Sequence, residues 1–176
     1  VARESRLPII IYDNPGTTHF QFSDDLVARL ARLPGIIGIK NPSSSPGQAV
    51  AHYHAQRGSV PNTFSIGYSA DWNCTEPLIA GACVWYSVLA GIMPSRCLKI
   101  VRAAQAGDAE GARKLNADLE PIWDLFKAYS SLRVVYEMAA LLDVAQAEPP
   151  LPILGLSQAN RRRVAEVLNV VLTNAA

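Results

Sequence analysis

The sequence predicts an α/β chain that alternates strands and helices at first and becomes purely helical later. Four short apolar runs end at Tyr12, Lys40, Gly67 and Ser87, which are 28, 27 and 20 residues apart. After about residue 106 only helical patterns follow. This spacing is typical of the strand–helix unit of a (β/α)8 barrel, where about 250 residues serve eight units. A doubly wound open sheet is the alternative, although the Gly-rich phosphate turn of its nucleotide-binding versions is absent.

The first two strands are continuous apolar runs. Residues 7–12 (LPIIIY) are stopped by the turn sequence DNPG at 13–16, and residues 35–40 (GIIGIK) lie between Pro-Gly and Asn-Pro. Such uninterrupted runs indicate strands that are buried on both faces. Between them we predict a helix that Ser23 caps and that ends before the Pro-Gly pair at 34–35. Its apolar stripe is formed by Leu26, Val27, Leu30 and Leu33.

The remaining elements follow from apolar spacing and from Gly, Pro and capping residues. In the first part we predict a helix over 48–57, a strand over 64–67, a helix over 70–80, a strand over 82–88 and a helix beginning at Pro94. In the second part we predict helices over 108–119, after Pro121, over 131–142 and after a Ser157 cap. The basic run 161–163 is interpreted as a solvated face or a contact between subunits.

Composition narrows the class of protein. The chain has 176 residues, is 49% hydrophobic and 18% charged, and carries a net charge of +1. It can therefore bury a real core, and it offers no electrostatic case for binding nucleic acid or an anionic membrane. No apolar run reaches the roughly 18 residues of a membrane span, and no signal peptide is expected at the N-terminus. Three cysteines without C-x-x-C spacing are expected to be small buried residues of a reduced, cytoplasmic protein.

Lys40 is the most informative residue, because an apolar strand seldom ends in an ammonium group. Partial desolvation at the mouth of such a strand favours the neutral amine, which is a nucleophile for carbonyl carbon. Lys40 is therefore a candidate for forming a Schiff base. The alternative is a strand-end lysine whose ammonium simply reaches solvent. His52 and His54 lie two apart in a predicted helix and point to different faces, so a metal site is not expected there.

Several motifs together resemble one known family, the dihydrodipicolinate synthase/N-acetylneuraminate lyase family. The stretch 8–15 (PIIIYDNP) is similar to its Y-N-x-P strand end, and 35–40 (GIIGIK) resembles its Schiff-base strand. Ile66-Gly67, the stretch from Gly81 to Ser87, Pro94 and Leu132-Arg133 follow in the family's order. The resemblance covers essentially the whole chain, and it corresponds to the later part of the family's own chain.

The resemblance implies a fold and a domain division. Residues 1–106 would supply strands five to eight of a (β/α)8 barrel, which is its C-terminal half, and residues 107–176 would form a C-terminal helical region. The family's first four strands are missing here, together with the G-T-T-G-E-type loop that holds the keto-acid carboxylate. The tyrosine that reaches in from a neighbouring subunit is missing too. Self-association into homo-oligomers is expected, since members are commonly dimers or tetramers.

The resemblance also implies a chemistry. Family members are class I aldolases, in which a lysine forms an imine with a 2-keto acid, usually pyruvate, that then meets an aldehyde partner. Lys40 would be the imine former and Tyr12 the proton relay, and no metal or organic cofactor is needed. Gly67 and Ser87 are candidates for substrate binding at the next strand ends, although a plain turn glycine and a loop-capping serine are the simpler interpretations. The loop after Tyr12 adds two further candidates for substrate contact, Thr17 and His19.

Departures from the family pattern bear on specificity. Synthases proper carry an arginine near Thr17, which this sequence lacks, so we expect a different 2-keto-acid or sugar-acid substrate. Val84 and Trp85 stand where the family has small residues, so we expect bulk to remodel the pocket. Asp71 is interpreted as either a polar substrate contact or a helix-start acid. The competing hypotheses are a non-catalytic half barrel that is truncated or pairs with another chain, and a keto-acid-binding regulator that keeps Lys40 without turnover.

Overall fold

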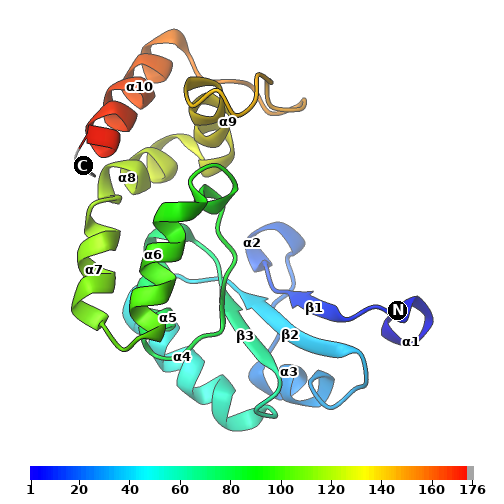
Figure 1. The fold of residues 1–176 in the computed structure, drawn as a ribbon. Helices are drawn as coiled ribbons and strands as arrows, with labels where there is room; N and C mark the ends of the chain where they lie inside the picture. Colours follow the sequence, from blue (N-terminus) through cyan, green and yellow to red (C-terminus); the bar gives the residue numbers. More distant parts are fainter. Residues whose placement is uncertain (174–176) are drawn as a thin grey trace. The chain divides into compact units, whose positions relative to one another are not determined.

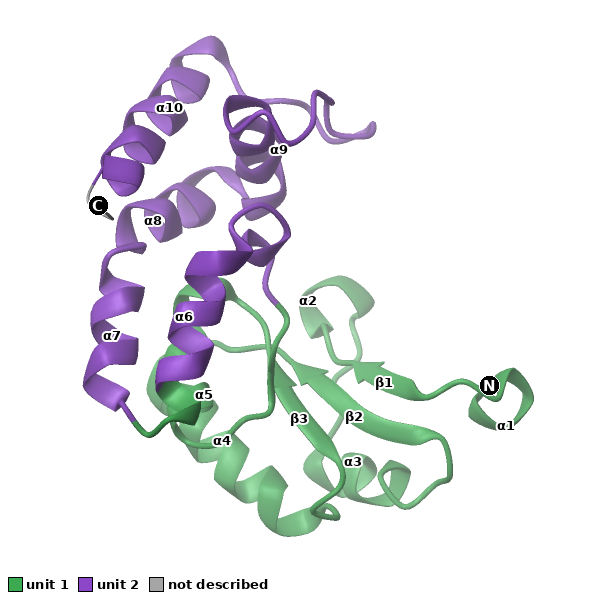
Figure 2. Ribbon diagram, viewed as in Figure 1, with its two compact units in different colours: residues 1–86, 104–107 green, residues 87–103, 108–176 purple. Residues whose placement is uncertain are grey.

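The chain divides into two compact units in a computed structural model that describes residues 1–173. Figure 2 shows unit 1, which contains Val1–Tyr86 and Ala104–Gly107, and unit 2, which contains Ser87–Ala103 and the chain from Asp108 onward. Unit 1 is α/β and unit 2 is helical. No helix within residues 1–173 combines the length and the apolar composition that crossing a membrane requires.

Unit 1 is built on a four-stranded parallel sheet, of which Figure 1 labels β1, β2 and β3. Its strands are β1 (Ile9–Tyr12), β2 (Ile36–Asn41), β3 (Ser65–Tyr68) and β4 (Val84–Trp85). They lie side by side in chain order, β1-β2-β3-β4. A doubly wound sheet reverses its strand order at a switch point, and no reversal occurs among the four described strands. The predicted α/β class is confirmed, and the strand order is that of successive βα units.

Two of the helices in unit 1 begin at capping serines, Ser23 and Ser45. The helices of unit 1 are α1 (Ala2–Ser5), α2 (Pro15–Thr18), α3 (Asp24–Leu30), α4 (Pro46–Ser59), η1 (Asp71–Asn73) and α5 (Thr75–Ile79). The Ser45 hydroxyl accepts the Gln48 N–H at 3.4 Å. With Pro46 in the first turn, α4 therefore begins before the predicted residue 48. The predicted helix 70–80 is split into η1 and α5 instead. Ala70 has a φ of 71°, which is not helical, and Pro77 is tolerated only in the first turn of a helix.

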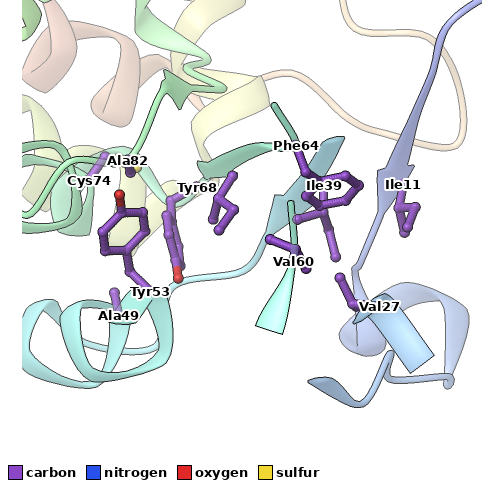
Figure 3. Close-up of a cluster of buried hydrophobic side chains, with 11 residues drawn as sticks. Ile11, Val27, Ile39, Ala49, Tyr53, Val60, Phe64, Tyr68, Cys74 and Ala82 are labelled. Carbon is purple, nitrogen blue, oxygen red and sulfur yellow. The ribbon is translucent and has the colours of Figure 1, made fainter. Parts of the chain in front are cut away.

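One face of the sheet carries the core of unit 1. Helices α3 and α4 pack against each other, and α4 also contacts β3 and α5. Ile39 and Ile66, which pair in register, are fully buried there, as is Val27 of α3. Figure 3 shows this cluster of Ile11, Val27, Ile39, Ala49, Tyr53, Val60, Phe64, Ile66, Tyr68, Cys74 and Ala82. Burial of this apolar surface is the main force that holds the sheet to its helices.

The opposite face of the sheet is partly exposed. Ile10 is 37% exposed and Tyr12 51%. The prediction that the first two strands are buried on both faces is therefore wrong. An uninterrupted apolar run does not reveal which of its two faces is covered, and only one face of β1 and β2 meets the helices of unit 1. Leu33 is also exposed, at 52%, because α3 ends at Leu30 before the predicted stripe is complete.

The fourth strand is shorter than predicted. Only Val84 and Trp85 are in β4, whereas the strand was predicted over 82–88. The Tyr86 N–H still donates to the Tyr68 carbonyl at 2.8 Å, and then the chain turns. The Ser87 hydroxyl accepts the Ala90 N–H at 3.0 Å at the entry of η2 (Leu89–Gly91). Ser87 is therefore a turn-capping residue of unit 2 and not a strand end.

Unit 2 is a stack of helices with its own core. Its elements are η2, most of α6 (Pro94–Gln105), α7 (Ala109–Ala117), α8 (Glu120–Tyr129), α9 (Ser131–Leu141) and α10 (Gln158–Thr173). Helices α8, α9 and α10 pack on one another. Trp123, Val134 and Val164, one from each, are fully buried. The apolar spacing also predicts that Leu98 of α6 and Leu172 of α10 point inward, but each is 44% exposed.

The connector between α9 and α10 is held by arginines. Arg133 donates to the Leu154 carbonyl at 2.8 Å and to the Gly155 carbonyl at 2.9 Å. Arg161 lies 3.1 Å from Glu137 and 2.8 Å from Glu148. The first residue of the basic run 161–163 thus forms ion pairs within unit 2. Charge-assisted bonds to carbonyls that lack a helical partner order this extended, Pro-rich segment.

Candidate functional site

Three predicted site residues lie in one row across the sheet. Tyr12 of β1 pairs in register with Lys40 of β2, and Lys40 pairs with Gly67 of β3. In a parallel sheet, register-paired residues project to the same face. Ile39 and Ile66 precede this row and point into the helix-covered core, so Lys40 and Gly67 face the opposite, partly exposed side. We call Tyr12, Lys40 and Gly67 the Lys40 row.

The Lys40 amine is flanked by aromatic rings. Its Nζ lies 4.6 Å from the centroid of the Tyr12 ring and 5.9 Å from the centroid of the Tyr86 ring. Among residues 1–173 no carboxylate forms an ion pair with Lys40. Lys40 is therefore half-buried beside two ring faces, which attract a cation, and none of the described carboxylates forms an ion pair with its amine. A carbonyl compound could reach it from the exposed side of the sheet.

Tyr12 is oriented by the residue two positions after it. The Asn14 amide donates to the Tyr12 oxygen at 2.6 Å. Because that bond occupies an acceptor position of the phenol, its O–H remains directed elsewhere and is able to donate. Asn14 is itself fixed, since its carbonyl accepts the N–H groups of Thr17 and Thr18 at 3.0 and 2.9 Å. The Tyr12 phenol therefore lies beside Lys40 with its oxygen held by Asn14 and its O–H able to donate.

Gly67 is required by its neighbours. A Cβ at this position would lie 2.5 Å from Tyr86 Cε2 and 2.8 Å from the Val84 carbonyl oxygen. Both distances are shorter than any ordinary contact, so no other residue fits without a shift. The Tyr86 ring occupies the space that a side chain at position 67 would fill. Tyr86 was not among the predicted site residues, although it stands two residues beyond Val84, which pairs with Gly67, and so shares that face.

Trp85 does not lie where bulk was expected to remodel the pocket. It pairs with Tyr68, packs against the helix-side core and donates its indole N–H to Asp71 at 3.1 Å. Alternation along β4 places it on the face opposite the Lys40 row. Asp71 is the first residue of η1 and is 2% exposed. The prediction for Trp85 is therefore wrong, and the bulky residue beside the lysine is Tyr86.

A buried polar pair lies directly behind the row. Asn41 follows Lys40 in β2, and its amide donates to the Gln56 side chain of α4 at 2.8 Å, with both residues 1% exposed. The Asn41 carbonyl accepts both the N–H and the hydroxyl of Ser69, at 3.0 and 3.1 Å. A buried amide pair of this kind fixes the strand that carries the lysine, because breaking it leaves a polar group without a partner.

A second polar chain joins three elements behind Gly67. Tyr68, which follows Gly67, has its hydroxyl 2.9 Å from His52 Nδ1, and His52 Nε2 lies 3.2 Å from Asp24. Burial raises the pKa of Tyr68 well above its ordinary value, and the negative charge of Asp24 raises it further. Tyr68 therefore remains a neutral hydrogen-bonding partner. Among residues 1–173 no group of three or more His, Cys, Asp or Glu residues is arranged to hold a metal ion.

The loop after Tyr12 presents two more of the predicted contacts. Thr17 lies in α2 and His19 follows it with a left-handed φ of 54°, and both side chains are exposed. The neighbouring Asp13 is buried, accepts the Phe22 N–H at 3.3 Å and donates its own N–H to the Lys40 carbonyl at 3.1 Å. Burial raises the pKa of Asp13. The loop is thus anchored at Lys40 and presents Thr17 and His19 to solvent.

The other predicted residues separate from the row or differ in burial. Ser87 belongs to unit 2, whereas the Lys40 row belongs to unit 1. Cys74 and Cys97 are buried as predicted, but Cys83 is exposed. Burial raises the pKa of the Cys74 thiol well above its ordinary value, so Cys74 is a packing residue and not a thiolate nucleophile. Within the described part of unit 1, the Lys40 row is the arrangement best suited to carbonyl chemistry.

Comparison with known proteins gives consistent matches. The model of the dihydrodipicolinate synthetase family matches residues 1–171. The 4-hydroxy-tetrahydrodipicolinate synthase of Alcanivorax borkumensis is 30% identical over 169 residues, which is 96% of this chain and 56% of that protein. The synthase of Thermodesulfovibrio yellowstonii is 31% identical over 168 residues, again 96% of this chain and 56% of that protein.

Solved structures agree. The crystal structure of dihydrodipicolinate synthase from Agrobacterium tumefaciens is 46% identical with a TM-score of 0.88, covering 94% of this chain and 56% of that one. The 4-hydroxy-tetrahydrodipicolinate synthase of Methylacidiphilum fumariolicum is 25% identical with a TM-score of 0.87, covering 98% of this chain and 56% of that one. The chain therefore spans about half the length of the relatives it matches. The family match over residues 1–171 shows that the chain belongs to the dihydrodipicolinate synthetase family.

Proposed function

We propose that this chain carries the Schiff-base machinery of a class I aldolase that acts on a 2-keto acid such as pyruvate. The observation that supports it most is the pairing of Lys40 with Tyr12 on adjoining parallel strands, with the amine 4.6 Å from the ring centroid. Class I aldolase chemistry needs a lysine amine and a group that gives and takes protons at oxygen. Membership of the family supports the same assignment.

In the proposed reaction, the neutral Lys40 amine attacks the keto carbon and a C–N bond forms. The keto oxygen becomes a hydroxyl group, and Tyr12 donates a proton so that it leaves as water and an iminium remains. The Tyr12 and Tyr86 ring faces stabilise that cation. The Tyr12 phenolate that this step leaves takes a proton from the carbon next to the iminium, which gives an enamine that adds to an aldehyde. The Asn14 bond keeps the phenol oriented through these steps.

The proposed substrate differs from that of a true dihydrodipicolinate synthase. Residues 13–22 of the loop after Tyr12 contain no arginine or lysine that would bind a second carboxylate. Exposed polar groups there include the Thr17 hydroxyl and the His19 imidazole, which suit hydroxyl or carbonyl oxygens. We therefore favour an aldehyde partner without a second carboxylate. Gly67 remains a candidate for substrate binding through the Tyr86 ring that it accommodates, and Ser87 remains a candidate substrate contact.

A second candidate function is a non-catalytic half barrel that binds a keto acid or pairs with another chain. Two observations favour it. β1 is an edge strand of the described sheet, and Ile10 and Tyr12 on its outer face are exposed. An apolar sheet edge of this kind tends to associate. The two candidates differ in whether Lys40 forms an imine in this chain by itself.

Borohydride trapping with pyruvate, followed by mass mapping, tests the proposal. The chain has four lysines, so a label on Lys40 is easily assigned. We expect an adduct on Lys40 that is lost in Lys40→Arg and kept in Lys99→Arg, whose lysine is exposed on α6. Tyr12→Phe should slow labelling by about 10²-fold, the lower end of general acid–base contributions. Absence of any Lys40 adduct would reject the proposal.

The DNA upstream of the Val1 codon separates the two candidates further. If the frame continues and encodes a segment with a G-T-T-G-E-like loop, the longer product is trapped beside the 176-residue chain. Labelling of the longer product alone would assign the 176-residue chain the non-catalytic role. Labelling of both would show that the Lys40 row is sufficient for imine formation.

A further inference from the structure

Tyr86 has a position in the site that its sequence context did not indicate. Its N–H donates to the Tyr68 carbonyl at 2.8 Å, which continues the pairing of β4 with β3 by one residue. Because side chains alternate, Tyr86 lies on the face of Val84 and Gly67, and not on the core face of Trp85. Tyr86 thus joins the Lys40 row from β4, although it lies outside the strand itself.

The ring of Tyr86 is held over Gly67. Its Cε2 atom lies 2.5 Å from where a Cβ of residue 67 would be, so the ring covers the glycine. The same ring has its centroid 5.9 Å from Lys40 Nζ. Burial raises the pKa of Tyr86, so the phenol adds no negative charge beside the amine. Tyr86 therefore bounds the space next to the Lys40 amine with an uncharged ring.

The space between the Lys40 amine and the Tyr86 ring is small. An imine carbon lies about 1.3 Å from its nitrogen, the length of a C–N bond with double-bond character. Along the line from Nζ at 5.9 Å, about 4.6 Å then remains to the ring centroid. Carbon–carbon contact requires about 3.5–4.0 Å, which leaves about 1 Å at most. The C3 carbon of a keto acid is bonded to this trigonal carbon at about 60° to the line, so it advances by about 0.8 Å and still fits, whereas a C4 carbon on the same side advances by about 1.5 Å more and does not.

We propose that Tyr86 is a specificity-determining residue, whose ring limits the carbon chain that the carbonyl carbon can carry on the Tyr86 side of Lys40. The proposal rests on the Schiff-base function proposed above and refines its substrate class. The chain should accept short 2-keto acids of pyruvate size and discriminate against those extended beyond C3. Gly67 then has a defined role, since it provides the space in which the Tyr86 ring lies.

The first test compares two keto acids in borohydride trapping. The Lys40 amine attacks the keto carbon, water leaves, and borohydride delivers a hydride to the imine carbon, so the label records imine formation alone. We expect wild type to label faster with pyruvate than with 2-oxobutanoate. In Tyr86→Ala, the rate ratio of 2-oxobutanoate to pyruvate should rise about tenfold or more, since one methylene in a confined pocket is worth about 10- to 200-fold.

Two further variants separate ring size from other effects. Tyr86→Phe keeps the ring and should keep the wild-type ratio. Tyr86→Leu replaces the ring with a smaller side chain and should give an intermediate ratio. Tyr86→Leu also keeps the test decisive if the alanine variant does not reach the wild-type far-UV CD spectrum. An unchanged ratio in a folded Tyr86→Leu or Tyr86→Ala protein would overturn the proposal.

A second measurement does not depend on keto-acid binding. Reductive alkylation with cyanoborohydride and straight-chain aldehydes of increasing length labels lysines without any carboxylate contact. The exposed Lys99 provides an internal reference. In wild type, the Lys40-to-Lys99 ratio should fall with aldehyde length, and in Tyr86→Ala this fall should largely disappear. If keto acids do not label while this length dependence holds, the proposed function fails and the role of Tyr86 stands; if the length dependence is the same in both proteins, the role of Tyr86 fails.

Discussion

Substitution of Gly67 by alanine tests the close packing on which the site depends. The new methyl group would lie 2.5 Å from Tyr86 Cε2, 2.8 Å from the Val84 oxygen and 3.0 Å from the Val84 Cβ. The Tyr86 ring is able to rotate away, but the Val84 carbonyl belongs to the backbone of β4 and cannot move in that way. Overpacking of this kind costs about 1–3 kcal/mol, and we expect about 2 kcal/mol because two of the three contacts are with Val84.

The matched control is Gly58→Ala in α4. No atom lies within 4 Å of a Cβ built at Gly58, and its backbone is helical. Alanine should therefore stabilise the chain there by about 0.5 kcal/mol, less than the interior helix value because Gly58 lies near the end of α4. Urea unfolding followed by far-UV CD measures both variants against wild type.

A double-mutant cycle assigns the cost to its source. In the Tyr86→Ala background the ring contact is absent, so Gly67→Ala should cost about 1 kcal/mol less, a coupling in the range found for contacting residues. The remaining cost comes from the Val84 carbonyl. The packing argument is refuted if Gly67→Ala is as well tolerated as Gly58→Ala, or if the coupling with Tyr86 is zero.

Three further predictions concern the supports of the site and the connector of unit 2. Above about pH 10 an unfolded phenol ionises while the buried Tyr68 stays protonated, so the free energy of unfolding should fall by about 1.4 kcal/mol per pH unit for this group; Tyr68→Phe should reduce that slope in urea titrations between pH 9 and about 12. Gln56→Leu leaves the buried Asn41 amide without its acceptor and should cost about 1–3 kcal/mol, and the Asn41→Leu/Gln56→Leu pair should cost less than the sum of the single changes; strictly additive costs would contradict the buried pair. Arg133→Ala removes two hydrogen bonds to connector carbonyls and should accelerate proteolysis between α9 and α10. Arg163→Ala loses only an exposed ion pair, so its free energy of unfolding should stay within about 0.5 kcal/mol of wild type. Equal proteolysis rates in the two variants would refute the role of Arg133.

Much of the Lys40 row was predictable because it depends on local spacing. Apolar runs that end at Tyr12, Lys40 and Gly67, separated by helix-length segments, indicate successive parallel strands whose ends meet at one edge. The register pairs of these three residues agree with that expectation. The capping serines at positions 23 and 157 were predictable for the same reason, since a cap bonds only to its own helix.

Features that depend on tertiary neighbours were not predictable. The exposure of Ile10 and Tyr12 depends on which face the helices cover, and an apolar run does not encode that choice. Tyr86 was missed because alternation along β4 does not say which of its two faces meets the core, and that choice depends on the packing of Trp85. The pairing of Asn41 with Gln56 joins residues that are 15 positions apart, and polar residue types alone do not identify such a partner.

The most direct test of the central claim compares imine formation at the four lysines. Pyruvate and borohydride are added to the product of the complete open reading frame that contains this chain, and the label is quantified at each lysine. We predict pyruvate-dependent labelling that is concentrated on Lys40 and strongly reduced in Tyr12→Phe. Equal, low labelling of Lys40, Lys99, Lys114 and Lys127 would contradict it, because Lys40 would then be an ordinary strand-end lysine.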